Sequence, residues 1–385
     1  MKQADQIGAG RMMEHNINLG NGRGGFVYKQ AGYGFFPRFH GARVVIFGLA
    51  AMENGEVAAM GVYCDDDSGL SWTGENQNTV ITFSADSGTT WSEYLVIEGL
   101  HSRPMMLTYL GKGALTFVMS WEKEPHAFFS RDHGRTWDER VAQQKVSNGG
   151  YLNVEGNRLV DRDESGSAVR IAEVGSNHAD GSVFPEASCE FIRWSSDGGR
   201  TWDTDAMPMG WRFQETYQGR TYTRSVSEGA LVRAANGWLV AALRTNMPQQ
   251  YVELHHDNYE GISVSLSKDE GESWSSLLKL YDAGRHHMNL ICLPNGDIVM
   301  PYIVRQDFRG GKMVSYRRGC EALISHDNGL SWDLHGRYIL DEFNYYDGVN
   351  STLTGHLAST LLDDGSILTT YGNYLTGSPL IRWTP

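Results

Sequence analysis

One eight-residue motif occurs five times in the chain of 385 residues and constrains its fold more than any other feature. The template is Ser-x-Asp-x-Gly-x-(Ser or Thr)-Trp. In such a segment the Asp side chain can accept hydrogen bonds from nearby backbone N–H groups, the Gly can adopt a positive φ, and the Trp can cover the turn. The copies begin at Ser84, Ser130, Ser195, Ser267 and Ser325. Each copy follows a short apolar run, so the motif predicts a series of strands that end in the same turn.

A second repeat alternates with the first. Six apolar runs are interrupted by a glycine turn and then resume, which is typical of β-hairpins. The turn glycines are Gly55, Gly113, Gly166, Gly237, Gly296 and Gly365. Together the repeats predict an all-β, six-bladed β-propeller of four-stranded antiparallel blades over residues 25–385, after an N-terminal extension over residues 1–24. We expect the segment near GGFVYKQ to supply the outer strand of the last blade, which would hide the sheet edges.

The composition excludes several classes of protein. The net charge is −13 and no basic stripe is visible, which argues against nucleic acid as a partner. No apolar run approaches the roughly 20 residues that span a membrane. The cysteines form no CxxC pair, and we predict neither a zinc site nor a cofactor. The first residues lack the apolar segment of a secretory signal, which favours a cytoplasmic location; a secreted or periplasmic location would require that a signal had been removed.

The octapeptides resemble the Asp boxes, or bacterial neuraminidase repeats, of the sialidase-like superfamily, and the resemblance covers about residues 25–385. It implies a six-bladed propeller whose boxes lie on the face opposite the active site. It also implies an enzyme of the glycosidase type, with a glycan or oligosaccharide as its partner.

The hairpin glycines provide a common register for the innermost strands. The positions nine residues before them are Ile46, Pro104, Asn157, Glu228, His287 and His356. In a propeller these strands begin around one axis, so the equivalent positions meet at the mouth of a channel. Four of the six are polar, and the preceding positions add Arg103 and His286. We interpret this ring as a binding pocket; the alternative is a purely structural channel.

Glu228 is the strongest single candidate in the ring. Arg244 follows it at the far end of the returning strand, so both side chains are expected on the same face. The resemblance implies that the glutamate polarises a nucleophile and that the arginine holds the carboxylate of the substrate, for which a bidentate geometry is suitable. The alternative is an internal ion pair that only orders the strands.

The resemblance also implies an aspartate general acid on the loop CDDDSGLSW of the first blade. Asp65 and Asp66 are the candidates for proton transfer to a leaving oxygen. Asp67 fits a degenerate octapeptide as its turn residue.

Three features depart from the sialidase pattern. The opening inner strand reads RVVIFGLA, without an Arg-Ile-Pro motif, although Arg38 and Arg43 lie nearby. His356 stands where the resemblance implies a tyrosine nucleophile, and Tyr345, Tyr346 and Tyr371 are close in sequence but out of register. The last substrate-binding arginine is expected at Arg317 or Arg318, and we select Arg318.

The histidines suggest a different chemistry. His287 and His356 occupy adjacent blades at the same height and can serve as general acid or base. With Glu228 they could also bind a divalent metal, but histidines without a metal are commoner. We therefore predict an exo-acting glycoside hydrolase, diverged from true sialidases, in which Arg103, Arg244 and Arg318 hold an acidic terminal sugar. The alternatives are a polysaccharide lyase with a histidine base and a non-catalytic carbohydrate-binding propeller.

Overall fold

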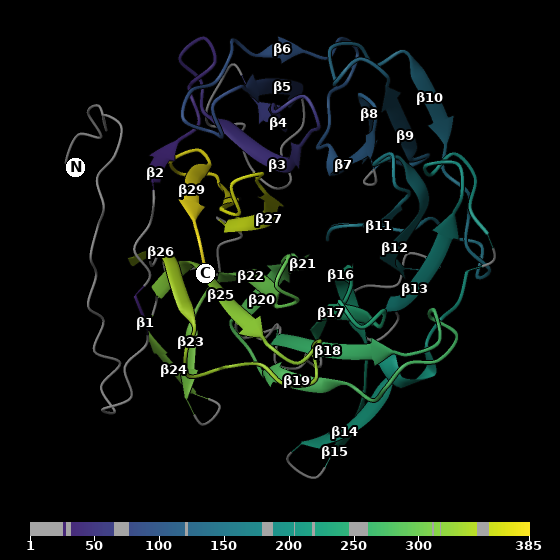
Figure 1. The fold of residues 1–385 in the computed structure, drawn as a ribbon. Helices are drawn as coiled ribbons and strands as arrows, with labels where there is room; N and C mark the ends of the chain where they lie inside the picture. The colour runs from purple at the N-terminus through teal and green to yellow at the C-terminus, as the bar shows by residue number, and fades with distance from the viewer. Residues whose placement is uncertain are drawn as a thin grey trace.

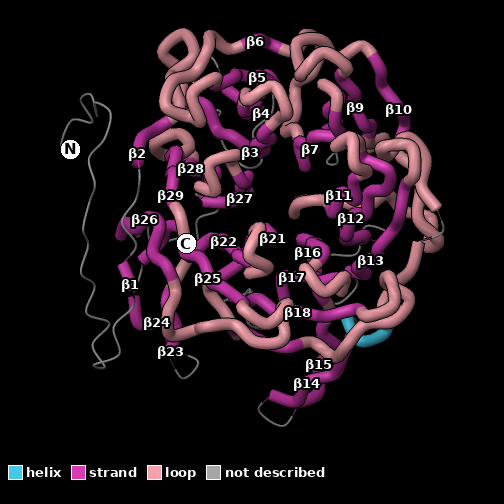
Figure 2. Tube along the Cα trace, viewed as in Figure 1, coloured by secondary structure: helices cyan, strands magenta, loops and turns pink. Residues whose placement is uncertain are grey.

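The protein is a β-propeller whose antiparallel sheets stand around a central axis in this computed structural model (Figure 1). The structure describes residues 26–27, 32–64, 77–119, 122–178, 188–203, 205–217, 220–245, 261–309, 312–315, 317–344 and 354–385. Within these ranges the chain consists of strands and loops apart from one 3-10 turn, Met209–Trp211 (Figure 2). The described residues contain no helix that is long and apolar enough to cross a membrane. The predicted fold class, all-β with six blades, is confirmed.

The first three blades come in chain order from the N-terminal half. The first contains β3 (Val44–Ala51), β4 (Val57–Tyr63), β5 (Asn78–Ser84) and β6 (Leu95–Val96). The second contains β7 (Met105–Gly111), β8 (Ala114–Met119), β9 (His126–Ser130) and β10 (Glu139–Ala142). The third contains β11 (Leu159–Arg162), β12 (Ala168–His178) and β13 (Ser188–Ser195).

The other three blades follow the same order. The fourth contains β16 (Val226–Arg233), β17 (Leu239–Thr245), β18 (Gly261–Ser267) and β19 (Leu278–Tyr281). The fifth contains β20 (Arg285–Met288), β21 (Ile291–Cys292), β22 (Ile298–Val304), β25 (Arg317–Ser325) and β26 (Tyr338–Asn344). The sixth contains β27 (Thr354–Leu361), β28 (Ile367–Asn373) and β29 (Pro379–Trp383). Two hairpins stand apart from the blades, β14 (Phe213–Tyr217) with β15 (Arg220–Arg224) and β23 (Asp307–Arg309) with β24 (Lys312–Ser315).

The sixth blade takes its outer strand from the beginning of the chain. Strand β2 (Gly32–Phe35) pairs antiparallel with β29. The sequence placed this strand slightly earlier, near residues 24–30. In that segment β1 (Phe26–Val27) instead pairs in parallel with β26 at the edge of the fifth blade. The N-terminal region therefore contacts both of the last two blades.

The apolar core lies between adjacent blades. All residues of β4, β17, β22 and β28 are buried. A strand that is covered on both faces needs apolar residues at successive positions, which explains segments such as IVMPYIV. Between the fourth and fifth blades, for example, Val240 and Val264 belong to the same cluster as Ile298 and Met300. This face-to-face packing fixes the height at which each inner strand begins.

The octapeptides form the hydrogen-bonded turns that their sequence predicts. In the first copy Asp86 accepts hydrogen bonds from the backbone N of Thr90 at 2.8 Å and from its Oγ1 at 2.7 Å. The Oγ of Ser84 accepts from the N of Gly88 at 2.8 Å, and Nε1 of Trp91 donates to the O of Gly88 at 3.2 Å. Asp132, Asp269 and Asp327 accept the equivalent bonds in their own copies. Each turn is thus closed by one carboxylate.

These carboxylates should make stability depend on acid pH. Burial raises the pKa of Asp86, but hydrogen bonds from Thr90 and Ser84 outweigh it and lower the pKa below its ordinary value. The pKa is also lowered in Asp132, Asp197, Asp269 and Asp327. A carboxylate with a lowered folded-state pKa stabilises the fold above its unfolded pKa, about 3.9 for Asp, and this contribution is lost as the pH falls.

We therefore expect the urea midpoint to decrease between about pH 5 and about pH 3, and to decrease less in Asp327→Asn than in the wild type. Urea titrations at several pH values measure this difference. An identical pH profile for the two proteins would contradict a role for the turn carboxylate.

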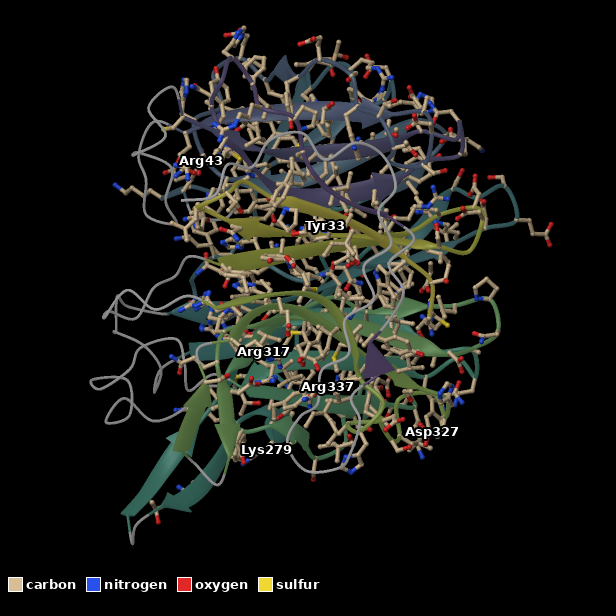
Figure 3. All side chains as sticks on the ribbon, turned by 90° about the vertical axis from the view of Figure 1, so that its left-hand side faces the viewer. Tyr33, Arg43, Lys279, Arg317, Asp327 and Arg337 are labelled. Carbon is tan, nitrogen blue, oxygen red and sulfur yellow. The ribbon has the colours of Figure 1, made fainter. Side chains whose placement is uncertain are left out.

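The strand register places the turns and the inner-strand starts at opposite ends of each blade. In the first blade Ser84 pairs with Val57, which in turn pairs with Ala51, while Val44 begins β3 at the other end. Figure 3 shows the same separation across the disc, with Asp327 toward one face and Arg43 and Arg317 toward the other. The inner strands therefore begin on the face opposite the octapeptide turns.

Candidate active site

The inner strands are kinked at the position that the sequence register singled out. Pairing to the neighbouring strand is interrupted between Ser227 and Ala230, between His286 and Met288, and between Gly355 and Leu357. The residues at these bulges have positive φ: 50° in Glu228, 46° in His287 and 55° in His356. Positive φ is unfavourable for a residue with a side chain, and a bulge redirects the side chain that it carries. The same kind of bulge therefore sets the direction of the side chains of Glu228, His287 and His356.

The three side chains meet beside the axis. Nδ1 of His287 lies 3.5 Å from Oε2 of Glu228. The ring centroids of His287 and His356 are 4.8 Å apart, and those of His286 and His287 are 4.4 Å apart. All four residues are buried. The structure thus brings together Glu228 of the fourth blade, His286 and His287 of the fifth and His356 of the sixth.

Glu155 joins this cluster and was missed by sequence reasoning. Its Oε2 lies 3.5 Å from Nδ1 of His287 and 3.8 Å from Nδ1 of His356. Counting back from the hairpin glycine selected Asn157, but the third inner strand is irregular between the Asn153–Ser176 bridge and β11. The usable signal was the dipeptide Glu155-Gly156, which matches Glu228-Gly229 in the next blade.

Asn157 lies outside the cluster, further along the channel toward the hairpin turns. Its Nδ2 donates to the O of Leu231 at 3.0 Å, and its Oδ1 accepts from the N of Leu290 at 2.7 Å. Both polar ends of the amide thus hold backbone groups of neighbouring blades. Asn157 also lines an axial cavity of 550 Å³ that extends toward the hairpin turns. The structure therefore gives Asn157 a packing role in the blades rather than a place beside Glu228.

The arginine predicted to accompany Glu228 forms an ion pair with it. Nη1 of Arg244 contacts Oε1 of Glu228, and its Nε donates to Oγ of Ser227 at 2.9 Å. This is the internal pair that the sequence left open as an alternative. It balances the negative charge of Glu228 and fixes its orientation at the bulge.

Arg305 occupies a similar place one blade further and was not predicted. It directly follows β22, whereas Arg244 is the penultimate residue of β17, and the Nε of Arg305 donates to the O of Thr354 at 3.0 Å. Its guanidinium lies near His287, because a Cβ added at Gly355 would lie 3.5 Å from Nη2 of Arg305 and 3.7 Å from Nε2 of His287. Arg305 therefore brings a positive charge to the histidine cluster.

The histidines are held neutral. Burial lowers the pKa of His286 well below its ordinary value, and the charges of Arg305, Arg244 and Arg318 lower it further. Burial likewise lowers the pKa of His287, with a contribution from the neighbouring imidazoles. Burial also lowers the pKa of His356, followed by the charges of Arg103 and Arg305. Neutral imidazoles can accept a proton or donate an electron pair to a metal.

Two further titratable groups border the cluster. Burial raises the pKa of Glu190 well above its ordinary value, and the charge of Glu155 raises it further, against the opposing effect of Arg244. Burial raises the pKa of Tyr374 to about 12, while the charge of Arg103 acts in the opposite direction. Glu190 is thus a candidate proton donor, and Tyr374 lies within the electrostatic influence of Arg103.

The remaining predicted residues separate into distinct environments. Arg317 belongs to an internal network, with its Nε 2.8 Å from Oδ2 of Asp307 and its Nη2 2.5 Å from Oε1 of Glu321. Arg318 affects the pKa of His286 and is the better candidate of the two. Arg43 donates to the O of Leu375, whereas Arg38 donates locally to the O of Gly41 at 2.8 Å. Asp65, Asp66 and Asp67, together with Tyr345 and Tyr346, lie outside the described residues.

Comparisons with known proteins identify the fold. No family model matches the sequence, and no curated protein matches it either. A protein of unknown function from Dyadobacter fermentans has a similar solved structure, with a TM-score of 0.65 and 15% identity over 93% of this chain and 99% of that chain.

Two enzymes are also similar in structure. The Hadza microbial sialidase Hz136 has a TM-score of 0.58 and 15% identity over 89% of this chain and 66% of that chain. The alpha-L-arabinanase of Penicillium chrysogenum has a TM-score of 0.53 and 15% identity over 88% of this chain and 93% of that chain. At such identities the likeness is one of fold. The chain is therefore a six-bladed β-propeller similar in architecture to sialidases and to an arabinanase.

Proposed function

We propose that this protein is an exo-acting glycoside hydrolase whose substrate carries an acidic terminal sugar. The observation that carries the proposal is the buried cluster of Glu228, Glu155 and neutral histidines, bordered by arginines, at the start of the inner strands. Sialidases and an arabinanase with the same architecture support a glycan as the substrate class. The fold alone does not select a reaction, so the proposal depends on this cluster.

The carboxyl groups differ in environment, as acid–base chemistry requires. Glu228 is paired with Arg244 and acts as the ionised carboxylate that polarises a nucleophile or a water molecule. Glu190 keeps its proton because burial raises its pKa, and it can supply a proton to the leaving oxygen. Asp65 and Asp66 remain predicted alternatives for that acid.

The arginines favour an anionic substrate. Arg103, Arg305 and Arg318 each affect the pKa of a histidine in the cluster, so their charges lie close to where the sugar would bind. A guanidinium binds a carboxylate through two parallel hydrogen bonds. An anionic sugar such as a uronate or a nonulosonate therefore fits this pocket better than a neutral sugar.

A polysaccharide lyase is the second candidate. The observation that favours it is the neutrality of His287 and His356 next to Arg305. A neutral imidazole can remove the proton next to a carboxylate whose charge an arginine neutralises. The lyase reaction leaves a carbon–carbon double bond in the product, whereas hydrolysis releases a reducing end without one.

A glycan panel with reducing-end and ultraviolet readouts tests the proposal. With Glu228→Gln we expect turnover to fall by about 100-fold or more, because the ionised carboxylate is lost while the side-chain shape is kept. Glu139→Gln, which alters a carboxylate bonded to Arg131 and Arg200 away from the axis, serves as the matched control and should retain activity.

Reducing ends without ultraviolet absorption would support hydrolysis, and absorbing products would replace it with the lyase reaction. Equal turnover by the wild type and Glu228→Gln would remove Glu228 from the mechanism. Glycan binding without turnover on the whole panel would contradict both reactions and leave a binding propeller.

A further inference from the structure

Three potential ligand atoms face one another at the axis at distances longer than an ordinary hydrogen bond. Oε2 of Glu155 lies 3.5 Å from Nδ1 of His287 and 3.8 Å from Nδ1 of His356. Hydrogen bonds between nitrogen and oxygen are shorter, about 2.7–3.2 Å. Among the described residues Nδ1 of His356 has no hydrogen-bond partner, although it is buried. The three groups converge but do not satisfy one another.

The spacing matches that of ligands around a shared ion. Ligands about 2.1 Å from a tetrahedral ion lie about 3.4 Å apart. The atoms offered by Glu155, His287 and His356 all lie within 4.8 Å of one another. A central ion would therefore need only small adjustments of these side chains to reach bonding distance.

The fold holds these ligands in place from three different blades. His287 lies on β20 and His356 on β27, and both occupy backbone bulges with positive φ. Their side chains are only 7% and 4% exposed, and that of Glu155 is 5% exposed. The ring of Phe47 packs on His356 with centroids 4.7 Å apart. Rigid, buried ligands of this kind lose little freedom when an ion binds.

We infer that Glu155, His287 and His356 form a binding site for a first-row divalent cation such as Zn²⁺. Two imidazoles and one carboxylate suit such an ion, whereas Mg²⁺ and Ca²⁺ prefer oxygen ligands alone. Three protein ligands leave a coordination position open for water or for an oxygen of a bound molecule. Oε2 of Glu228 is 3.5 Å from Nδ1 of His287, so this carboxylate borders the ion as well.

The neighbouring arginines oppose the cation and provide an additional test. Arg305 and Arg103 act electrostatically on His356, while Glu155 and Glu228 supply negative charge. Removing one positive charge should strengthen binding. We therefore expect Arg305→Met to bind Zn²⁺ more tightly than the wild type.

The experiment uses the whole chain after removal of metal with a chelator. Zn²⁺, Co²⁺, Mg²⁺ and Ca²⁺ are titrated by calorimetry, bound metal is measured by elemental analysis, and the visible spectrum of the Co²⁺ form reports nitrogen and oxygen coordination. We expect one equivalent of Zn²⁺ or Co²⁺ per chain and no comparable binding of Mg²⁺ or Ca²⁺. Glu155→Gln and His356→Gln should each weaken binding by about 100-fold or more, because loss of an outer-shell partner of a ligand already costs about 10–100-fold. His326→Gln, at an exposed histidine, is the matched control.

Several results would overturn the site: no stoichiometric binding by the folded wild type, or unchanged binding in both ligand variants. Loss of binding only in His286→Gln would also reject it. Circular dichroism checks that each variant is folded, and the Co²⁺ spectrum of the wild type does not depend on any variant. The inference is independent of the proposed function, because Zn²⁺ binding with no turnover on any glycan would refute the enzyme and leave the metal site intact.

Discussion

Glu173→Gln is expected to destabilise the protein by about 3–5 kcal/mol, because it leaves buried guanidinium groups without a counter-charge. Glu173 lies on β12 and its side chain is 0% exposed. Its Oε2 accepts hydrogen bonds from Arg158 at 2.9 and 2.7 Å, and its Oε1 accepts one from Arg193 at 2.8 Å. Burial raises the pKa of Glu173, but the charges of Arg193 and Arg158 outweigh it and lower the pKa. Equilibrium unfolding in urea measures the loss.

The matched control for this prediction is Glu139→Gln. Glu139 also contacts two arginines, Arg131 and Arg200, but the side chains of this group are 28–77% exposed. Exposed ion pairs contribute about 0–1 kcal/mol, so this variant should change stability little. Equal destabilisation by the two substitutions would show that burial does not control the effect.

Gly156→Ala is expected to destabilise the protein by about 3 kcal/mol, at the upper end of the effects of overpacking. A Cβ at this position would lie 2.0 Å from the O of Gly229 and 2.8 Å from Cα of Ala230. Backbone atoms of the next inner strand cannot move aside as a flexible side chain can. Because Gly229 follows Glu228, the same substitution should also displace that carboxylate. Urea unfolding measures the stability.

Gly34→Ala provides the comparison for the steric effect. Gly34 lies on β2, and a Cβ added there would meet nothing within 4 Å. Alanine costs less conformational entropy than glycine, so stability should stay equal or rise by up to about 1 kcal/mol. A loss in Gly34→Ala as large as that in Gly156→Ala would exclude the contact between inner strands as the cause.

The fold could be predicted from the sequence because its signals are local. A turn closed by Asp86 or Asp327 depends on eight consecutive residues, and a hairpin depends on its glycine. These signals repeat, so their number fixed the number of blades. The strand that closes the sixth blade was placed a few residues too early, since a pairing between Gly32–Phe35 and Pro379–Trp383 leaves no periodic signal in either segment.

The candidate site was predictable only where the inner strands are equivalent. Glu228, His287 and His356 stand at the same distance from their hairpin glycines and share a bulge, so one count aligned them. The irregular third strand shifted the count from Glu155 to Asn157. Arg305 and Tyr374 come from the ends of returning strands, and Glu190 comes from a third strand. Only the packing of the blades brings these groups to the axis.

The pairing of β2 with β29, which closes the sixth blade, has a consequence for biosynthesis. Gly32–Phe35 is synthesised before the inner strands of all six blades, yet its antiparallel partner β29 is completed only at Trp383. Until then neither edge can be covered by the other, and uncovered strand edges tend to associate with other chains. The sixth blade therefore keeps an uncovered edge while the six blades are being synthesised, and the ring closes only after β29 has emerged.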